Sequence, residues 1–170
     1  QILIPKIIDI ARAKKHSIYI IDDNSQDGTN ELINEFQNQH KNIHYLWRPQ
    51  KLGLGTAYMA GFAFARSRDY DTCITMDSDL SHNPESIPSL KDLIIKGAHV
   101  AVGSRYIPGG QIIGWPKHRY ALSRGANILS KKLLKLSTND CTSGFRAYNR
   151  EAYEFLLSEN FQSHGYALLE

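Results

Sequence analysis

Two kinds of apolar pattern alternate along the chain. Short runs rich in β-branched residues are typical of buried strands, whereas apolar residues recurring every three or four positions are typical of helices packed on one face. The predicted strands are 17–22, 42–47, 72–77 and 99–104, and the predicted helices between them are 30–36, 56–65 and 84–95. Alternation of this kind predicts an α/β fold, in which a mostly parallel sheet is flanked by helices on both faces.

The apolar pattern also runs to both ends of the sequence. Residues 2–11 have helical spacing, and Leu168 and Leu169 end the chain. With 170 residues, of which 42% are hydrophobic and 22% charged, the composition fits one domain with one core. We therefore expect residues 1–170 to form a single domain that is truncated at both ends. No apolar run is long enough to span a bilayer.

The charged residues are distributed unevenly along the chain, and this distribution indicates the kind of partner. The net charge is only +3, yet residues 93–139 contain no Asp or Glu and eight Lys or Arg. A basic segment of this kind favours anionic partners such as phosphates, nucleic acid or an acidic membrane surface. The plainer alternative is a solvated, lysine-rich helix around Lys131, Lys132 and Lys135.

Acidic residues follow two of the predicted strands, where ligands of α/β sheets bind. Asp22 and Asp23 end the first strand, and their carboxylates can accept hydrogen bonds from a nucleobase or ribose. A capped turn into the next helix is the alternative for this motif.

Asp77 and Asp79 flank Ser78 at the end of the third strand. This spacing can hold a hard divalent cation, Mg²⁺ or Mn²⁺, which bridges a diphosphate. We expect Asp79 to coordinate it directly and Asp77 to contact the ribose or a metal-bound water. Ser81 and His82 could reach the same cluster, although a single histidine in a loop is more often a surface residue.

A glycine-rich segment at 48–61 precedes the second helix. Its glycine spacing does not fit a dinucleotide fingerprint. A helix that begins after Gly53 can still approach the diphosphate of a nucleotide sugar, and close packing of helix on sheet is the alternative. We include Lys51, Gly53 and Ser78 among the candidate nucleotide-sugar ligands.

Arginine and serine recur in three later segments, 102–110, 114–127 and 140–148. These residue types together bind phosphate through charge-assisted and hydroxyl hydrogen bonds. Some of the arginines could instead only clamp loops, and we expect this of Arg124. The residues concerned are Arg105, Arg119, Arg124 and Arg146 with Ser104, Ser123 and Ser143.

Taken in order, these motifs resemble the dolichyl-phosphate (polyprenol monophosphate) mannosyltransferases, a branch of the family-2 glycosyltransferases with the A-type, Rossmann-like nucleotide-sugar fold. The matching segments are IIDDNSQDGT (20–29), RPQKLGLGTAY (48–58), MDSDLSHNPE (76–85), VGSRY (102–106), WPKHRYALSRGAN (115–127) and DCTSGFRAY (140–148). The resemblance covers nearly the whole chain.

The resemblance implies a single glycosyltransferase catalytic domain that transfers mannose from GDP-mannose to polyprenyl or dolichyl phosphate, with inversion and a divalent metal. It implies that Asp22 and Asp23 hold the nucleoside and that Asp77 and Asp79 hold ribose and metal. It also implies that the lipid phosphate is bound by Arg105, Arg119 and Ser123. The residues expected to carry catalysis are therefore Asp79, Arg105 and Arg119. The family's first-strand Pro-x-x-Asn-Glu segment is not present here, and Ser81 stands where members often have Gln.

The implied partners are GDP-mannose, the lipid phosphate and a membrane surface to which the protein is peripheral, without nucleic acid. An accessory subunit could anchor it. The implied location is the cytoplasmic face of a membrane, the endoplasmic reticulum in a eukaryote or the plasma membrane in a prokaryote. Three alternatives remain: a UDP-glucose-dependent polyprenyl-phosphate glucosyltransferase, a non-catalytic nucleotide-binding module, and a receiver domain, which would need a lysine where Arg105 stands.

Overall fold

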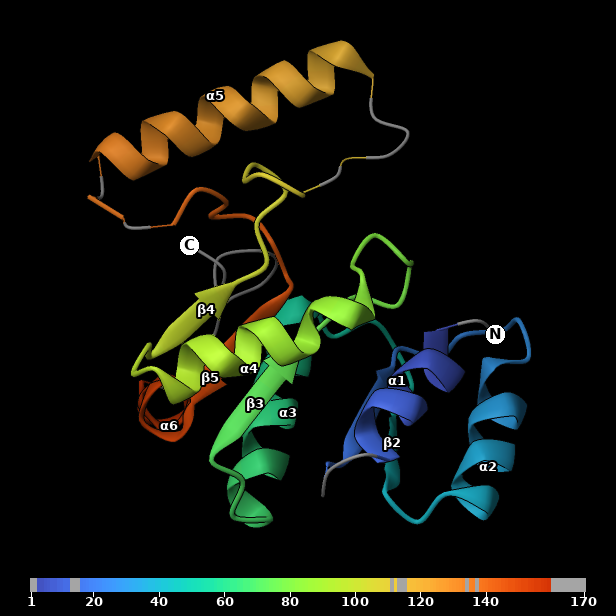
Figure 1. Cartoon of the computed structure of the whole chain (residues 1–170). Coiled ribbons are helices and arrows are strands. Elements are labelled where there is room, and N and C mark those ends of the chain that lie inside the picture. Colours follow the sequence, from blue (N-terminus) through green and yellow to red (C-terminus); the bar gives the residue numbers. More distant parts are fainter. Residues whose placement is uncertain are drawn as a thin grey trace.

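The computed structural model describes residues 3–12, 16–110, 112, 116–133, 135–136 and 138–159, without the side chains of residues 11, 12, 117 and 119. It confirms the α/β fold class (Figure 1). The elements are α1 (Leu3–Arg12), β1 (Ile18–Asp22), α2 (Thr29–Gln39), β2 (Ile43–Trp47), α3 (Leu54–Ser67), β3 (Thr72–Thr75), the 3-10 turn η1 (Pro84–Ser86), α4 (Ile87–Ile95), β4 (Val100–Val102), α5 (Lys117–Leu133), β5 (Arg146–Asn149) and α6 (Arg150–Ser158).

The strands form two hydrogen-bonded groups. β1 and β2 pair in parallel, from Ile18 opposite Ile43 to Asp22 opposite Trp47. In the second group β5 lies between β3 and β4 and is antiparallel to both. All four predicted strands are therefore confirmed, with the third and fourth ending two residues early. β5 was not predicted, and it interrupts the parallel order.

Successive side chains in and next to β5 pack into a hydrophobic cluster on each face of the sheet. Tyr148 packs with Phe62 of α3 and Tyr153 of α6 on one face. Ala147 and Phe145 pack with Leu90 of α4 on the other. Because successive strand side chains point to opposite faces, this short strand joins α3 and α6 to α4 through the sheet. The helices thus cover both faces, as the sequence pattern predicts.

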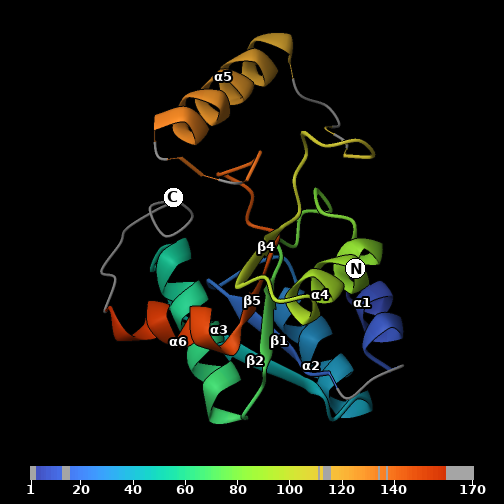
Figure 2. The ribbon, with the colours of Figure 1, turned by 60° about the vertical axis from the view of Figure 1, so that its left-hand side comes forward.

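Helix α5 stands apart from this packed body in both ribbon views (Figures 1 and 2). The chain leaves the body after β4, forms α5 and returns to begin β5. We refer to the other elements, α1 to β4 with β5 and α6, as the body. The carboxyl ends of β3 and β4 point from the body toward α5 (Figure 1).

Candidate functional site

The turn after β1 is held by its own two carboxylates. Asp22 is buried and accepts hydrogen bonds from the backbone N–H of Ser25 (3.0 Å) and from its hydroxyl (2.5 Å). The Tyr45 hydroxyl donates to Asp22 from β2 at 3.3 Å. Asp23 pairs with Arg48, whose Nε lies 2.5 Å from its Oδ1. Both predicted nucleoside ligands therefore lie together, each already bound to donors of the chain.

Arg48 connects this turn to the start of α3. Its guanidinium is buried and donates through Nη1 to the Thr56 hydroxyl at 2.7 Å and through Nη2 to the Gly53 carbonyl at 3.5 Å. Gly53 has φ 90°, in the region that favours glycine, so the sharp entry into α3 depends on it. Lys51 lies two residues earlier and is exposed. Arg48 thus brings the candidate residues Asp23 and Gly53 together, and Lys51 lies on the same loop as Gly53.

The loop after β3 carries Asp77, Ser78 and Asp79. Hydrogen bonds from the hydroxyl and backbone N–H of Ser81 lower the pKa of Asp79. Burial raises the pKa of Asp77, and the nearby charge of Asp79 acts in the same direction. A carboxyl whose charged form is disfavoured by burial and by a second carboxylate is a suitable donor, together with that carboxylate, for a hard divalent cation. In the described part of the chain no third His, Cys, Asp or Glu joins them to complete a metal-binding group.

Neighbouring residues lie close to the partly exposed Asp77 on two sides. A Cβ added to Gly144 would lie 3.2 Å from both Asp77 carboxylate oxygens and 2.7 Å from the Tyr58 hydroxyl. Only glycine therefore allows the chain before β5 to pass this close. Tyr58 belongs to the same helix end as Thr56, so the first turns of α3 link the Asp23 turn to the Asp77 loop.

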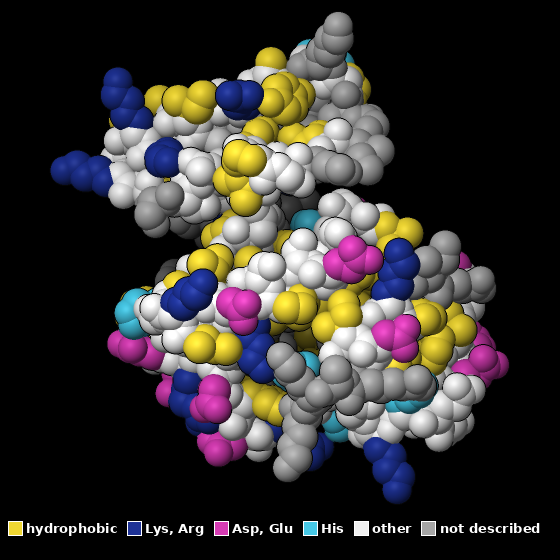
Figure 3. All heavy atoms as spheres, in the orientation of Figure 1, with side chains coloured by type: hydrophobic (Ala, Val, Ile, Leu, Met, Phe, Trp, Pro, Cys, Tyr) yellow, Lys and Arg dark blue, Asp and Glu magenta, His cyan; other side chains and the backbone are white. Residues whose placement is uncertain are grey.

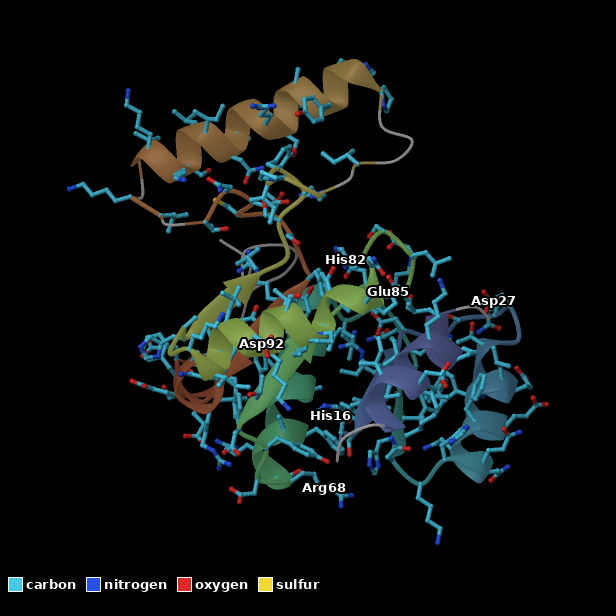
Figure 4. All side chains as sticks on the ribbon, in the orientation of Figure 1. His16, Asp27, Arg68, His82, Glu85 and Asp92 are labelled. Carbon is cyan, nitrogen blue, oxygen red and sulfur yellow. The ribbon has the colours of Figure 1, made fainter. Side chains whose placement is uncertain are left out.

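His82 lies on another side of Asp77 and is buried, so Ser81 and His82 both reach the cluster of Asp77 and Asp79, and the alternative of a surface histidine does not hold. The place of His82 after β3 is labelled in Figure 4, beside Glu85. Its Nδ1 accepts a hydrogen bond from the Asp77 backbone N–H at 3.2 Å, and its ring stacks on Phe145 at 5.2 Å between centroids. The sequence offered no sign of burial because the partner, Phe145, is distant in the chain.

Arg105 follows β4 and forms a bidentate pair with Asp140. The Nε and Nη2 atoms of Arg105 lie 2.7 and 2.8 Å from the two carboxylate oxygens, and the Arg105 backbone N–H also donates to Asp140. Asp140 is fully buried. Burial alone would raise the pKa of Asp140, but the bonds from Arg105 lower it overall. Thr142 accepts from Nη2 as well, at 2.9 Å.

Arg105 also lies close enough to Asp77 for its charge to oppose the raised pKa of that carboxyl. Arg105 and Asp77, which were predicted to bind opposite substrates, therefore lie within range of each other's charge. Asp140 was missed as a site residue, although it is the first residue of segment 140–148, which also contains the candidates Ser143 and Arg146, and this was the available signal.

Ser123 joins this cluster through Tyr106, whose hydroxyl donates to Ser123 Oγ at 2.7 Å. The Arg105 guanidinium lies over the Tyr106 ring at 5.7 Å. Arg119 belongs to α5, but its side chain lies outside the described residues. Arg124 does not clamp the loops to the body: it is exposed and donates to the Tyr120 hydroxyl one turn earlier in α5, at 2.7 Å. That expectation was wrong.

Comparison with known proteins identifies the family of this chain. The model of a family described as "Glycosyl transferase family 2" matches residues 3–157. This chain belongs to glycosyl transferase family 2. The family match confirms the resemblance, and the A-type, Rossmann-like fold that it implies is consistent with the observed elements.

Two relatives of this family-2 chain are similar over most of its length. A polyprenol monophosphomannose synthase from Mycolicibacterium smegmatis is 42% identical over 150 residues, which cover 88% of this chain and 57% of the relative. An undecaprenyl-phosphate mannosyltransferase from Micrococcus luteus is 35% identical over 149 residues, covering 88% of this chain and 61% of the relative. The chain thus spans about three fifths of the length of these relatives.

Proposed function

We propose that this protein transfers mannose from GDP-mannose to a polyprenyl phosphate, such as dolichyl phosphate, with inversion at the sugar carbon and with the help of a divalent cation. The observation that carries the proposal is that two oppositely charged groups lie within range of each other's charge. The charge of Arg105, which lies inside the segment 93–139 without acidic residues, acts on the Asp77 carboxyl of the loop that also carries Asp79. The names of both relatives, which combine a polyprenyl phosphate with mannose, support this choice of substrates.

On the donor side, the paired carboxylates after β1 and the start of α3 suit a nucleoside and its diphosphate. Asp22 and Asp23 offer acceptors for base and ribose, and Gly53 lets the diphosphate approach the N-terminus of α3. Asp77 and Asp79 would hold the cation. A cation bound there would neutralise the negative charge that develops on the departing nucleoside diphosphate.

On the acceptor side, Arg105, Arg119 and Ser123 would bind the lipid phosphate. A phosphate oxygen attacks the sugar carbon as the bond to GDP breaks, and the configuration inverts. A phosphate monoester carries about −1.5 to −2 charge at neutral pH, so it needs no proton removed before it attacks. The chain therefore needs to position and neutralise the nucleophile rather than deprotonate it.

Asp140 fits this mechanism because it is not a free base. Its two oxygens are occupied by Arg105, and the pKa of the carboxyl is lowered. Its role is to hold the guanidinium in place for a second anion. A hydroxyl acceptor would by contrast call for a carboxylate able to take a proton.

A lipid acceptor requires access to a membrane, and we propose that α5 provides it by lying on the cytoplasmic surface. Leu122, Leu129 and Leu133 fall on one face of the helix, and they are 76%, 57% and 69% exposed. Figure 3 shows apolar and basic side chains on the part that contains α5, with the visible acidic side chains confined to the body. Such a face is typical of helices that bind anionic lipid surfaces. Among the described residues, none of the helices is long and apolar enough to cross a bilayer.

The proposal is tested first by calorimetric titration with GDP-mannose, GDP, UDP-glucose and UDP, each with and without Mn²⁺ or Mg²⁺. We expect binding of the guanine nucleotides only, and only with the cation. In Asp79→Asn this binding should weaken by two orders of magnitude or more, since one of two carboxylates on a hard cation is lost. The matched control is Asp92→Asn, an acidic residue on α4. A preference for UDP-glucose would show that UDP-glucose, and not GDP-mannose, is the donor. Binding that does not need the metal would show that the cation plays no part in donor binding.

Transfer itself is tested with an α-linked donor and a short polyprenyl phosphate, with the product configuration read by NMR. A β-linked mannosyl phosphate is expected. An α-linked product would exclude direct attack by the lipid phosphate. Donor binding without transfer to any lipid phosphate would instead support a nucleotide-binding module.

A further inference from the structure

His82 has the contacts of a group that holds another side chain in place. Its ring is 8% exposed and lies between Phe145, on which it stacks with an interplanar angle of 18°, and the main chain of Asp77. A histidine that served packing alone would need only the Phe145 contact. The ring nitrogens instead both face residue 77.

The hydrogen bond fixes which ring nitrogen carries the proton. The Asp77 backbone N–H donates to Nδ1, so Nδ1 must be without hydrogen, and the proton of the neutral imidazole sits on Nε2. Nε2 lies 4.0 Å from the Asp77 carboxylate oxygen Oδ2. One ring thus engages the main chain of Asp77 and places a donor on the side of its carboxylate.

Gly144 lies near Asp77 on another side. A Cβ at this position would lie 3.2 Å from both carboxylate oxygens, so a side chain here would crowd the carboxylate. Phe145, which supports the His82 ring, follows Gly144 directly. The segment before β5 therefore passes beside Asp77 and is linked to it through His82.

We propose that His82 is a positioning residue, which fixes Asp77 for binding of a nucleoside diphosphate with its divalent cation by accepting the Asp77 backbone N–H at Nδ1. The proposal rests on the function proposed above and adds a residue to its donor site. His82 does not itself need to contact the donor. Groups that orient the ligands of a metal commonly affect its affinity by about 10- to 100-fold.

Two substitutions separate this role from packing. Asparagine can place its Oδ1 near the position of Nδ1 and keep an acceptor for the Asp77 N–H. Leucine fills a similar volume and has no acceptor. We expect Mn²⁺-dependent binding of GDP, measured by calorimetry, to stay within about threefold of wild type in His82→Asn and to weaken about 10- to 100-fold in His82→Leu. The melting temperature of each variant is measured without ligand.

A second measurement does not depend on the function. In ¹⁵N NMR of the ligand-free protein, His82 is assigned by the resonance lost in His82→Asn and should show an unprotonated Nδ1 and a protonated Nε2. The opposite tautomer would overturn the proposal, as would equal GDP affinity in His82→Leu and wild type. Equal losses of affinity in both variants, in step with their melting temperatures, would reduce His82 to packing. If the wild type binds no nucleoside diphosphate with Mn²⁺, the proposed function fails, and the positioning role that rests on it is withdrawn whatever the tautomer.

Discussion

The body and helix α5 use apolar residues in opposite ways. In the body, residues such as Phe62, Ala147 and Tyr153 are completely buried between the sheet and its helices. In α5 the leucines of one face point outward, and polar groups on the other face make the contacts with the rest of the chain. The body is thus stabilised by burial, whereas α5 is held by a few hydrogen bonds. This difference fits the proposed division between a donor site in the packed body and a helix that binds a membrane surface.

Three contacts hold the inner face of α5, at positions four residues apart. Tyr106 donates to Ser123, the Cys141 backbone N–H donates to Asn127 at 2.6 Å, and Lys131 donates to Asn139 at 2.6 Å. Spacing of four places these residues on one side of the helix. The leucines at 122, 129 and 133 fall on the opposite side, so α5 is amphipathic with its polar face toward the body.

The largest effect on stability is expected in the body core. Phe62→Ala removes a fully buried ring that packs against Tyr148 at 4.9 Å and should lower the free energy of unfolding by about 3–5 kcal/mol. Urea denaturation followed by circular dichroism measures it. Phe155→Ala on α6, where the ring is 59% exposed, is the control and should cost far less. Similar losses in both variants would contradict the described core.

A second prediction concerns the ion pair that joins the loop after β4 to the segment before β5. Asp140→Asn leaves the partly buried Arg105 charge uncompensated and should cost about 3 kcal/mol at neutral pH. Because the pKa of Asp140 is lowered in the folded protein, its contribution is present above the unfolded pKa of about 3.9 and is lost as pH falls through the folded value. The difference between wild type and Asp140→Asn should therefore shrink in acid. A difference that grows below pH 4 would mean that the pair does not stabilise the charged carboxylate.

A third, smaller effect is expected where α5 joins the body. Asn127→Ala leaves the buried Cys141 N–H without its acceptor, at a cost of about 1–3 kcal/mol. We expect the loss to be felt mainly as local opening, so hydrogen exchange should accelerate in α5 while β3 and β5 remain protected. Uniform acceleration throughout the protein would show that α5 and the body unfold as one unit. Asn34→Ala on the exposed surface of α2 serves as the control.

The comparison also explains what could be predicted from the sequence. The strands up to β4 and the helices between them follow from periodicity, because each buries one face against a neighbour. β5 escaped prediction because its position between β3 and β4 depends on pairing with strands far away in the chain. In the site, Asp77 and Asp79 are visible as a motif. The burial of His82 and the pairing of Arg105 with Asp140 depend on contacts across 63 and 35 positions, which no local pattern encodes.

The smallest effect on stability, with a large effect on binding, is expected for the outer face of α5. Replacing Leu122, Leu129 and Leu133 together by glutamine keeps good helix propensity and removes exposed apolar area. Each exposed substitution should change the free energy of unfolding by no more than about 0.5 kcal/mol.

The same three substitutions should weaken binding to lipid vesicles much more than they change stability. Burying a leucine side chain contributes about 1.5–3 kcal/mol, so the triple variant should lose at least tenfold in partitioning to vesicles that contain anionic lipid. Sedimentation with phosphatidylglycerol vesicles measures it, and purely zwitterionic vesicles show the share due to charge. Leu93→Gln with Ile95→Gln on α4, where the side chains are 47% and 71% exposed, is the control and should bind as wild type does. If the triple variant unfolds several kcal/mol more easily, these leucines pack against the protein. If it binds vesicles like wild type, α5 is not the surface that meets the membrane.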